Sequence, residues 1–174
     1  MKKLTGLDKI KTAIFISGTG SNLKNLIKFS YEENSPISIN LVISNKKNAK
    51  GLKYADQYNI PKMVLDSEKK IINQIIKKKI TFICLAGFMK ILSCSFIKIF
   101  NEKIINIHPS LLPKYKGLNT HKRALKNKEK YSGCTVHYVT SKLDSGKLIL
   151  QKRVKIKKND TEKSLKINIL KEEH

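Results

Sequence analysis

The sequence predicts an α/β protein with a Rossmann-like, doubly wound and mostly parallel sheet. Short apolar runs of strand length alternate with longer segments whose apolar residues recur at helical spacing. Some of these runs, such as residues 81–86, are apolar on both faces, which is typical of parallel strands covered by helices. With 174 residues, 40% of them hydrophobic, the chain can bury one core, so we expect a single domain over 1–174.

The first half of the chain carries the alternation of strands and helices. We expect strands at residues 12–17, 37–44, 62–65, 81–86 and 103–106. The first helix should be capped by Ser21 or Asn22, the second should cover 48–58, and the third should run from a cap at Asp66 to residue 79. Residues 1–10 are a polar, basic extension before the first strand.

The second half has a different organisation. Residues 108–117 contain two prolines and should form an irregular loop, and 120–127 should form a helix. Two β-like segments follow, 133–140 and 147–154, separated by a turn at 143–146. Asp160 is then expected to cap a final helix that reaches the end of the chain.

The charge balance favours small anionic partners. Thirty-six basic and 13 acidic residues give a net charge of +23. Proteins that recognise nucleic-acid bases do so preferentially through arginine side chains, but only Arg123 and Arg153 are arginines here. This composition argues against a nucleic-acid partner. No apolar run approaches the roughly 20 residues of a membrane span, so we expect no membrane partner and a cytoplasmic location.

A glycine-rich turn links the first strand to the first helix. Residues 17–22 read SGTGSN, so backbone N–H groups and the helix N-terminus can approach a phosphate closely. The turn lacks the third glycine of a dinucleotide fingerprint and the lysine of a P-loop. An ordinary turn is an equally good reading of this motif by itself.

A polar pair follows the fifth predicted strand. Asn106 and His108 should project to the same side, about 6.5 Å apart along an extended chain. An amide donor beside an imidazole suits the stabilisation of an oxyanion. Asp144 would keep the imidazole charged if it lay beside it, but an aspartate before Ser145 and Gly146 is also a common turn residue. No spacing of the remaining histidines and cysteines indicates a metal site.

Five stretches of the sequence resemble the folate-dependent phosphoribosylglycinamide formyltransferases. They are ISGTGSN (16–22), LAGFMKIL (85–92), INIHPSLLPKYKG (105–117), THKRAL (120–125) and GCTVHYVTSKLDSGKLILQ (133–151). They occur in the family's order, from about residue 12 to the end of the chain. The HPSLLP and LDSG motifs are specific to folate-dependent formyl-group enzymes, and the GTGSN loop narrows the resemblance to this family.

The resemblance implies a formyltransferase fold, 10-formyltetrahydrofolate as co-substrate and no metal. It implies formyl transfer to glycinamide ribonucleotide, with Asn106, His108 and Asp144 as catalytic residues. The substrate-binding residues that it implies are Gly20, Ser21, Asn22 and Glu173. The folate-binding residues that it implies are Met89, Lys90, Ile91, Leu92, Asn106, Thr140 and Asp144.

The chain also departs from the family pattern in three places. Lys90 stands where the family has arginine, which keeps the charge but loses the forked donor geometry. The segment between residues 65 and 81 is short and lacks an arginine for the folate tail. Family members continue past the position of His174, so we expect closing elements of the fold to be missing. We expect a monomer or a homodimer.

Three other functions remain open on the sequence. Methionyl-tRNA formyltransferase and formyltetrahydrofolate hydrolase share the motifs, but the first normally has a further C-terminal domain and the second a further N-terminal domain. The third is an inactive, truncated basic binding module. Formyl transfer that depends on glycinamide ribonucleotide would separate the main prediction from all three.

Overall fold

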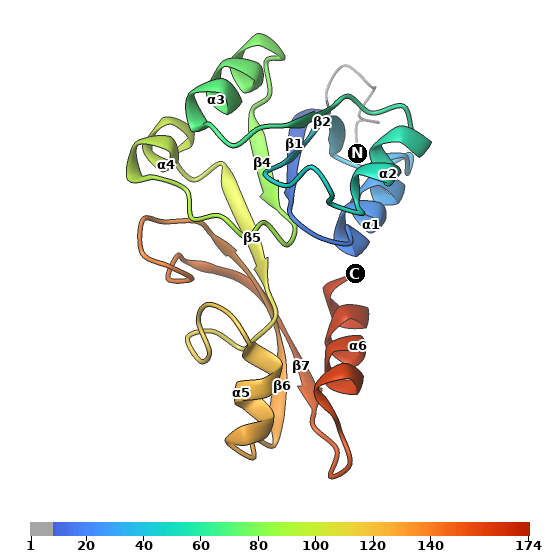
Figure 1. Cartoon of the computed structure of the whole chain (residues 1–174), viewed down its shortest axis with the longest axis vertical. Coiled ribbons are helices and arrows are strands. Elements are labelled where there is room, and N and C mark those ends of the chain that lie inside the picture. Colours follow the sequence, from blue (N-terminus) through green and yellow to red (C-terminus); the bar gives the residue numbers. More distant parts are fainter. Residues whose placement is uncertain (1–8) are drawn as a thin grey trace. The chain divides into compact units, whose positions relative to one another are not determined.

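The computed structural model describes residues 9–174, so residues 1–8 of the predicted basic extension lie outside the described residues. The described chain alternates strands and helices (Figure 1) and divides into two compact units, one ending at Ile104 and the other covering Ile105–His174. Across residues 9–174, no helix combines the length and the apolar character that a membrane crossing needs.

The first unit contains a parallel sheet with strand order β3-β2-β1-β4. Its elements are β1 (Ile10–Ile16), α1 (Ser21–Ser30), β2 (Ile37–Ser44), α2 (Leu52–Gln57), β3 (Lys62–Val64), α3 (Glu68–Lys77), β4 (Phe82–Leu85) and α4 (Cys94–Phe100). Successive residues of β1, Ala13 to Ile16, are all fully buried, so both faces of this central strand are covered. The predicted α/β class with a mostly parallel, Rossmann-like sheet is confirmed.

Helix α4 was not predicted from the sequence. It is only two turns long, and its two buried residues, Phe96 and Phe100, are too few to show a helical period. The available signal was Ser93, whose hydroxyl accepts a hydrogen bond from the Phe96 N–H at 3.1 Å and caps the helix. Phe96 then packs edge-on against Phe15 of β1, with ring centroids 6.3 Å apart.

The second unit is built on an antiparallel sheet with strand order β5-β6-β7. Its strands are β5 (Ile104–His108), β6 (Tyr131–Tyr138) and β7 (Leu148–Lys155), and its helices are α5 (Thr120–Lys126) and α6 (Glu162–Glu173). The long β6–β7 hairpin, α5 and α6 are drawn in yellow to red in Figure 1. Helix α6 buries Leu165 and Ile169 against Cys134 of β6, and these residues form an apolar cluster in the unit.

The helix caps differ from the predictions. Gly20, in the left-handed conformation, stands at the N-cap of α1 in place of Ser21 or Asn22. Ser67 rather than Asp66 precedes α3. Thr161 caps α6 in a reciprocal capping box with Ser164, while Asp160 accepts a hydrogen bond from the Ser164 hydroxyl at 2.7 Å. The second helix is shorter than predicted and begins at Leu52.

Candidate functional site

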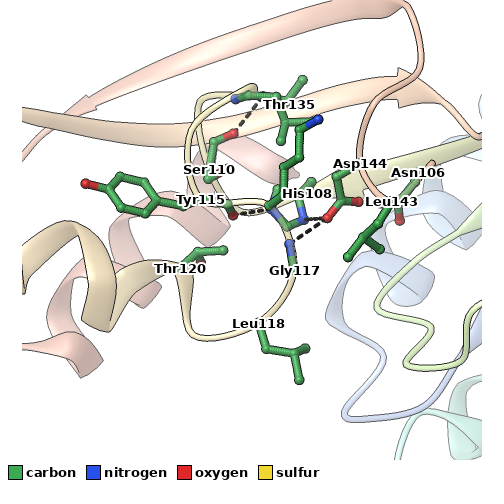
Figure 2. A network of polar contacts seen from close by, with 12 residues as sticks. Asn106, His108, Ser110, Tyr115, Gly117, Leu118, Thr120, Thr135, Leu143 and Asp144 are labelled. Atoms are coloured by element: carbon green, nitrogen blue, oxygen red, sulfur yellow. Dashed lines mark hydrogen bonds and ion pairs between the residues drawn. The ribbon is translucent and has the colours of Figure 1, made fainter.

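The structure brings together two of the predicted catalytic residues that are far apart in the sequence. His108 is the last residue of β5, and Asp144 lies in the connection between β6 and β7. The Asp144 Oδ2 atom is 3.4 Å from the His108 Nδ1 atom, and the two side chains are only 8% and 7% exposed. Figure 2 shows the carboxylate facing the imidazole. An electrostatic interaction at this depth is poorly screened by solvent.

A second loop holds the Asp144 carboxylate in place. The Gly117 N–H donates to Asp144 Oδ2 at 2.8 Å (Figure 2). Burial raises the pKa of Asp144, but the imidazole of His137, the Gly117 donor and the charge of His108 outweigh burial and hold that pKa below its usual range. Asp144 is therefore a carboxylate at neutral pH.

Both ring nitrogens of His108 face oxygen acceptors. Nδ1 faces Asp144, and Nε2 lies 2.9 Å from the carbonyl oxygen of Tyr115, to which it donates. A carbonyl oxygen can only accept, so the arrangement suits an imidazole that carries a proton on each nitrogen. In this position a protonated imidazole can offer an N–H to a developing negative charge.

Buried hydrogen bonds fix the loop that follows His108. The Thr135 hydroxyl donates to the Ser110 carbonyl at 2.6 Å and accepts from the Leu112 N–H at 3.1 Å. Ser110 is itself fully buried, and its hydroxyl donates to the Lys114 carbonyl at 2.7 Å. These bonds set the path of the loop that brings the Tyr115 carbonyl to His108.

Asn106 is linked to the His108–Asp144 pair by His137, a residue to which the sequence analysis assigned no role. Its Nδ2 atom is 3.2 Å from Nε2 of His137, and the same Nε2 atom is 3.6 Å from Asp144 Oδ1. His137 is the cross-strand partner of Asn106 in the β5–β6 register. The only available signal was the antiparallel pairing of these two strands, which the local sequence pattern does not reveal.

The glycine-rich turn opens helix α1 as predicted. Gly20 has φ of 75°, and Ser21 and Asn22 begin the helix, whose first turn carries no acidic residue. A Cβ atom on Gly20 would lie 2.5 Å from the Cα atom of Gly51, so the turn depends on close contact between two glycine backbones. The N-terminus of this ten-residue helix carries partial positive charge, which favours an anion.

We expect Gly20→Ala to lower the free energy of unfolding by about 2–4 kcal/mol, because alanine meets both the Gly51 backbone and an unfavourable positive φ. The melting temperature should fall by roughly 5–15 °C for a chain of this size. Gly18→Ala is the matched control, since no atom lies within 4 Å of its added Cβ atom. Equal melting temperatures for the two variants would contradict this account.

The predicted folate-binding segment follows β4. The Met89 N–H donates to the Ser17 hydroxyl at 2.7 Å, and the Lys90 ammonium donates to the Asp66 carbonyl. Met89 and Ile91 are 63% and 75% exposed, whereas the Leu92 side chain is buried and could contribute only its backbone to a ligand.

Two further predicted binding residues belong to the second unit. The Thr140 hydroxyl donates to the Lys142 carbonyl at 3.1 Å, within the turn that leads to Asp144. Glu173 lies in the last turn of α6. Burial, followed by the charges of Glu173 and Glu172, raises the pKa of the Cys134 thiol to about 11.

A model of the formyl transferase family matches residues 10–174. The chain is 41% identical to the phosphoribosylglycinamide formyltransferase of Haemophilus influenzae, over 87% of this chain and 76% of that protein. It is 40% identical to the trifunctional purine biosynthetic protein adenosine-3 of Gallus gallus over 96% of its own length, but it spans only 18% of that protein.

Solved structures show the same similarity. The phosphoribosylglycinamide formyltransferase of Anaplasma phagocytophilum superimposes with a TM-score of 0.92 at 42% identity, over 94% of this chain and 80% of that one. The phosphoribosylglycinamide formyltransferase of Brucella melitensis superimposes with a TM-score of 0.90 at 40% identity, over 95% of this chain and 90% of that one.

Proposed function

The chain belongs to the phosphoribosylglycinamide formyltransferases of the formyl transferase family, and from that membership we propose that it transfers a formyl group from 10-formyltetrahydrofolate to the amine of N1-(5-phospho-D-ribosyl)glycinamide. The observation that carries the proposal is the buried His108–Asp144 charge pair, two residues along β5 from Asn106. We place this activity in the cytoplasm and in purine biosynthesis, the process that names the trifunctional relatives.

The reaction needs a site that stabilises an oxyanion and then moves a proton. The substrate amine attacks the formyl carbon, and the carbonyl oxygen gains negative charge. We propose that the Asn106 amide and the protonated His108 donate to that oxygen, with the oxyanion taking the Nε2 hydrogen bond that Tyr115 accepts here. A proton passes from the new ammonium group to the folate nitrogen, and the intermediate collapses to formylated product and tetrahydrofolate.

The two substrates are both anionic, which suits a chain with a net charge of +23. We propose that Gly20, Ser21 and Asn22 hold the ribose phosphate, because a helix N-terminus presents backbone donors to a phosphate. The folate would contact the segment 89–92, Asn106, Thr140 and Asp144, and Glu173 would contact the glycinamide substrate. These assignments rest on the family resemblance of the residues.

The direct test is an assay of formyl transfer with the purified protein. We expect loss of formyl-folate, followed by absorbance, to require glycinamide ribonucleotide. Loss of formyl-folate in its absence would indicate a hydrolase, and loss that requires charged initiator tRNA would indicate the tRNA enzyme. No loss with any acceptor would contradict formyl transfer altogether.

Ligand binding provides an independent measurement. Either substrate at 100 times its dissociation constant should stabilise the folded chain by about 2.7 kcal/mol, which raises the melting temperature by several degrees. Inorganic phosphate alone should produce a smaller shift, since it can fill only the predicted phosphate site. Unchanged melting temperatures with both substrates would contradict the proposed sites.

A further inference from the structure

Two residues that contact His108 have a left-handed backbone conformation, which non-glycine residues rarely adopt. Tyr115 has a φ of 57° and Asp144 has a φ of 44°. The other non-glycine residues with positive φ in the described part of the chain all lie at helix ends: Asn59, Lys79, Glu102, Asn119 and Lys128. A left-handed residue is common at a helix end, but Tyr115 and Asp144 lie in loops. Such conformations persist where the surrounding contacts impose them, and they gather at functional sites.

The conformation of Tyr115 directs its carbonyl oxygen at His108. This oxygen lies 2.9 Å from Nε2 of the imidazole, whereas the phenol ring of Tyr115 points away from the imidazole (Figure 2). The contact requires a hydrogen on Nε2, and it holds whether or not Nδ1 carries one as well. Asp144 faces the other side of the imidazole, with Oδ2 at 3.4 Å from Nδ1. The two left-handed residues together therefore fix the orientation of the His108 ring.

The Tyr115 side chain is anchored by residues of helix α5 and of the segment that follows it. Its hydroxyl donates to Glu129 Oε1 at 2.8 Å and accepts from Asn127 Nδ2 at 2.9 Å. The Lys114 ammonium donates to the same Glu129 oxygen at 2.8 Å, so two successive loop residues are tied to one carboxylate. The Arg123 guanidinium lies over the Tyr115 ring, 5.1 Å from its centroid. These contacts offset the unfavourable backbone conformation of Tyr115.

We propose that Tyr115 is a positioning residue: its side chain, anchored by Glu129, keeps its backbone in the left-handed conformation that sets its carbonyl oxygen against Nε2 of His108. This oxygen accepts the hydrogen bond that the proposed oxyanion would take over. It thereby holds that edge of the imidazole in the direction needed for reaction before the substrates bind, so the ring need not turn later. This role rests on the proposed formyl transfer, because Tyr115 acts only through His108.

The first kinetic test removes the anchor of the side chain. Tyr115→Phe removes the hydroxyl and Glu129→Leu removes its acceptor, and each should lower kcat about 5- to 30-fold while changing both KM values less than about threefold. Glu129→Gln keeps an oxygen that accepts from the phenol, so its kcat should stay within about threefold of that of the unmodified enzyme. Lys130→Gln, which changes one charge on an exposed neighbour of Glu129, is the matched control and should leave kcat unchanged.

Two outcomes of this test would overturn the proposal. One is a Glu129→Gln variant as slow as Glu129→Leu, since the acceptor oxygen would then have no effect. The other is an unchanged or raised kcat in Tyr115→Phe. A raised kcat would show that the Tyr115 carbonyl competes with the oxyanion for His108 instead of positioning the imidazole.

The second kinetic test addresses the backbone conformation and the path through His108. Tyr115→Ala and Tyr115→Gly both lack the anchored ring, but only glycine adopts a positive φ without strain, so the glycine variant should have the higher kcat by at least about threefold. In a His108→Ala background, Tyr115→Phe should change kcat less than about twofold, because its target is already absent. An alanine variant as fast as the glycine variant, or an undiminished effect of Tyr115→Phe in that background, would contradict the proposed role.

The contact with His108 can be measured without catalysis. In proton–nitrogen spectra, the hydrogen on Nε2 of His108 should exchange slowly with water in the unmodified protein and in Glu129→Gln, because the Tyr115 carbonyl holds it. It should exchange at least about tenfold faster in Glu129→Leu. Equal exchange in the three proteins, or an Nε2 atom without hydrogen, would overturn the proposal even in an inactive protein. A protein that transfers no formyl group to any acceptor would overturn the proposed function, while these spectra would still decide whether Tyr115 holds the imidazole.

Discussion

Replacing His108 with alanine is expected to lower kcat by about two to three orders of magnitude, the usual effect of removing one donor to an oxyanion. His108 is buried, and its two nitrogens are already held by Asp144 and the Tyr115 carbonyl. No large movement is then needed to orient the ring before reaction. The KM values should change much less than kcat, because the donor acts mainly on charge that develops in the transition state.

The stability of this variant must be measured alongside its rate. Removing the imidazole leaves the Tyr115 carbonyl without its donor, at a cost of about 1–3 kcal/mol. His108→Asn keeps a neutral donor without the charge, so its rate should fall between those of the alanine variant and the unmodified enzyme. Asn106→Ala should produce a comparable loss of rate. A folded His108→Ala variant that retained more than about a tenth of the normal kcat would show that the imidazole is not an essential donor.

Replacing Asp144 with asparagine is expected to lower kcat by about 100-fold or more, because the counter-charge of His108 is lost. The substitution is nearly isosteric, and the asparagine oxygen can still accept from the Gly117 N–H. The loop geometry is thereby preserved, and the variant isolates the effect of charge. Asp144→Ala, which removes the acceptor as well, should lower both kcat and stability.

The same variant should change how stability depends on acidity. The pKa of Asp144 is lower in the folded protein than its ordinary value of 3.8, so the folded state binds this proton less readily than the unfolded state does. The resulting stabilisation is fully present above about pH 4 and is lost as the pH falls through the folded-state value. Urea unfolding between pH 2 and pH 7 should be less pH-dependent for Asp144→Asn, and identical slopes would contradict the charge pair.

Features encoded by neighbouring residues could be predicted from the sequence. The apolar runs gave the strands of the parallel sheet, and the position of Gly20 between a strand and a helix gave the turn that opens α1. Two-residue periodicity predicted a common side for Asn106 and His108. Helix α4 was missed because its two buried residues are too few to show a helical period. The N-cap residues were misplaced because several neighbouring small polar residues can cap a helix, and tertiary packing selects among them.

The amino-acid sequence alone determined the α/β class, the family motifs and the placing of an amide and an imidazole at one strand end, since each depends on residues close together in the chain. Only the tertiary structure decided that Asp144 reaches His108 and that His137 stands opposite Asn106. Both contacts depend on strand register and loop path. These are set by the packing of segments distant in the sequence, and a shift of one residue would turn the side chains to the other face.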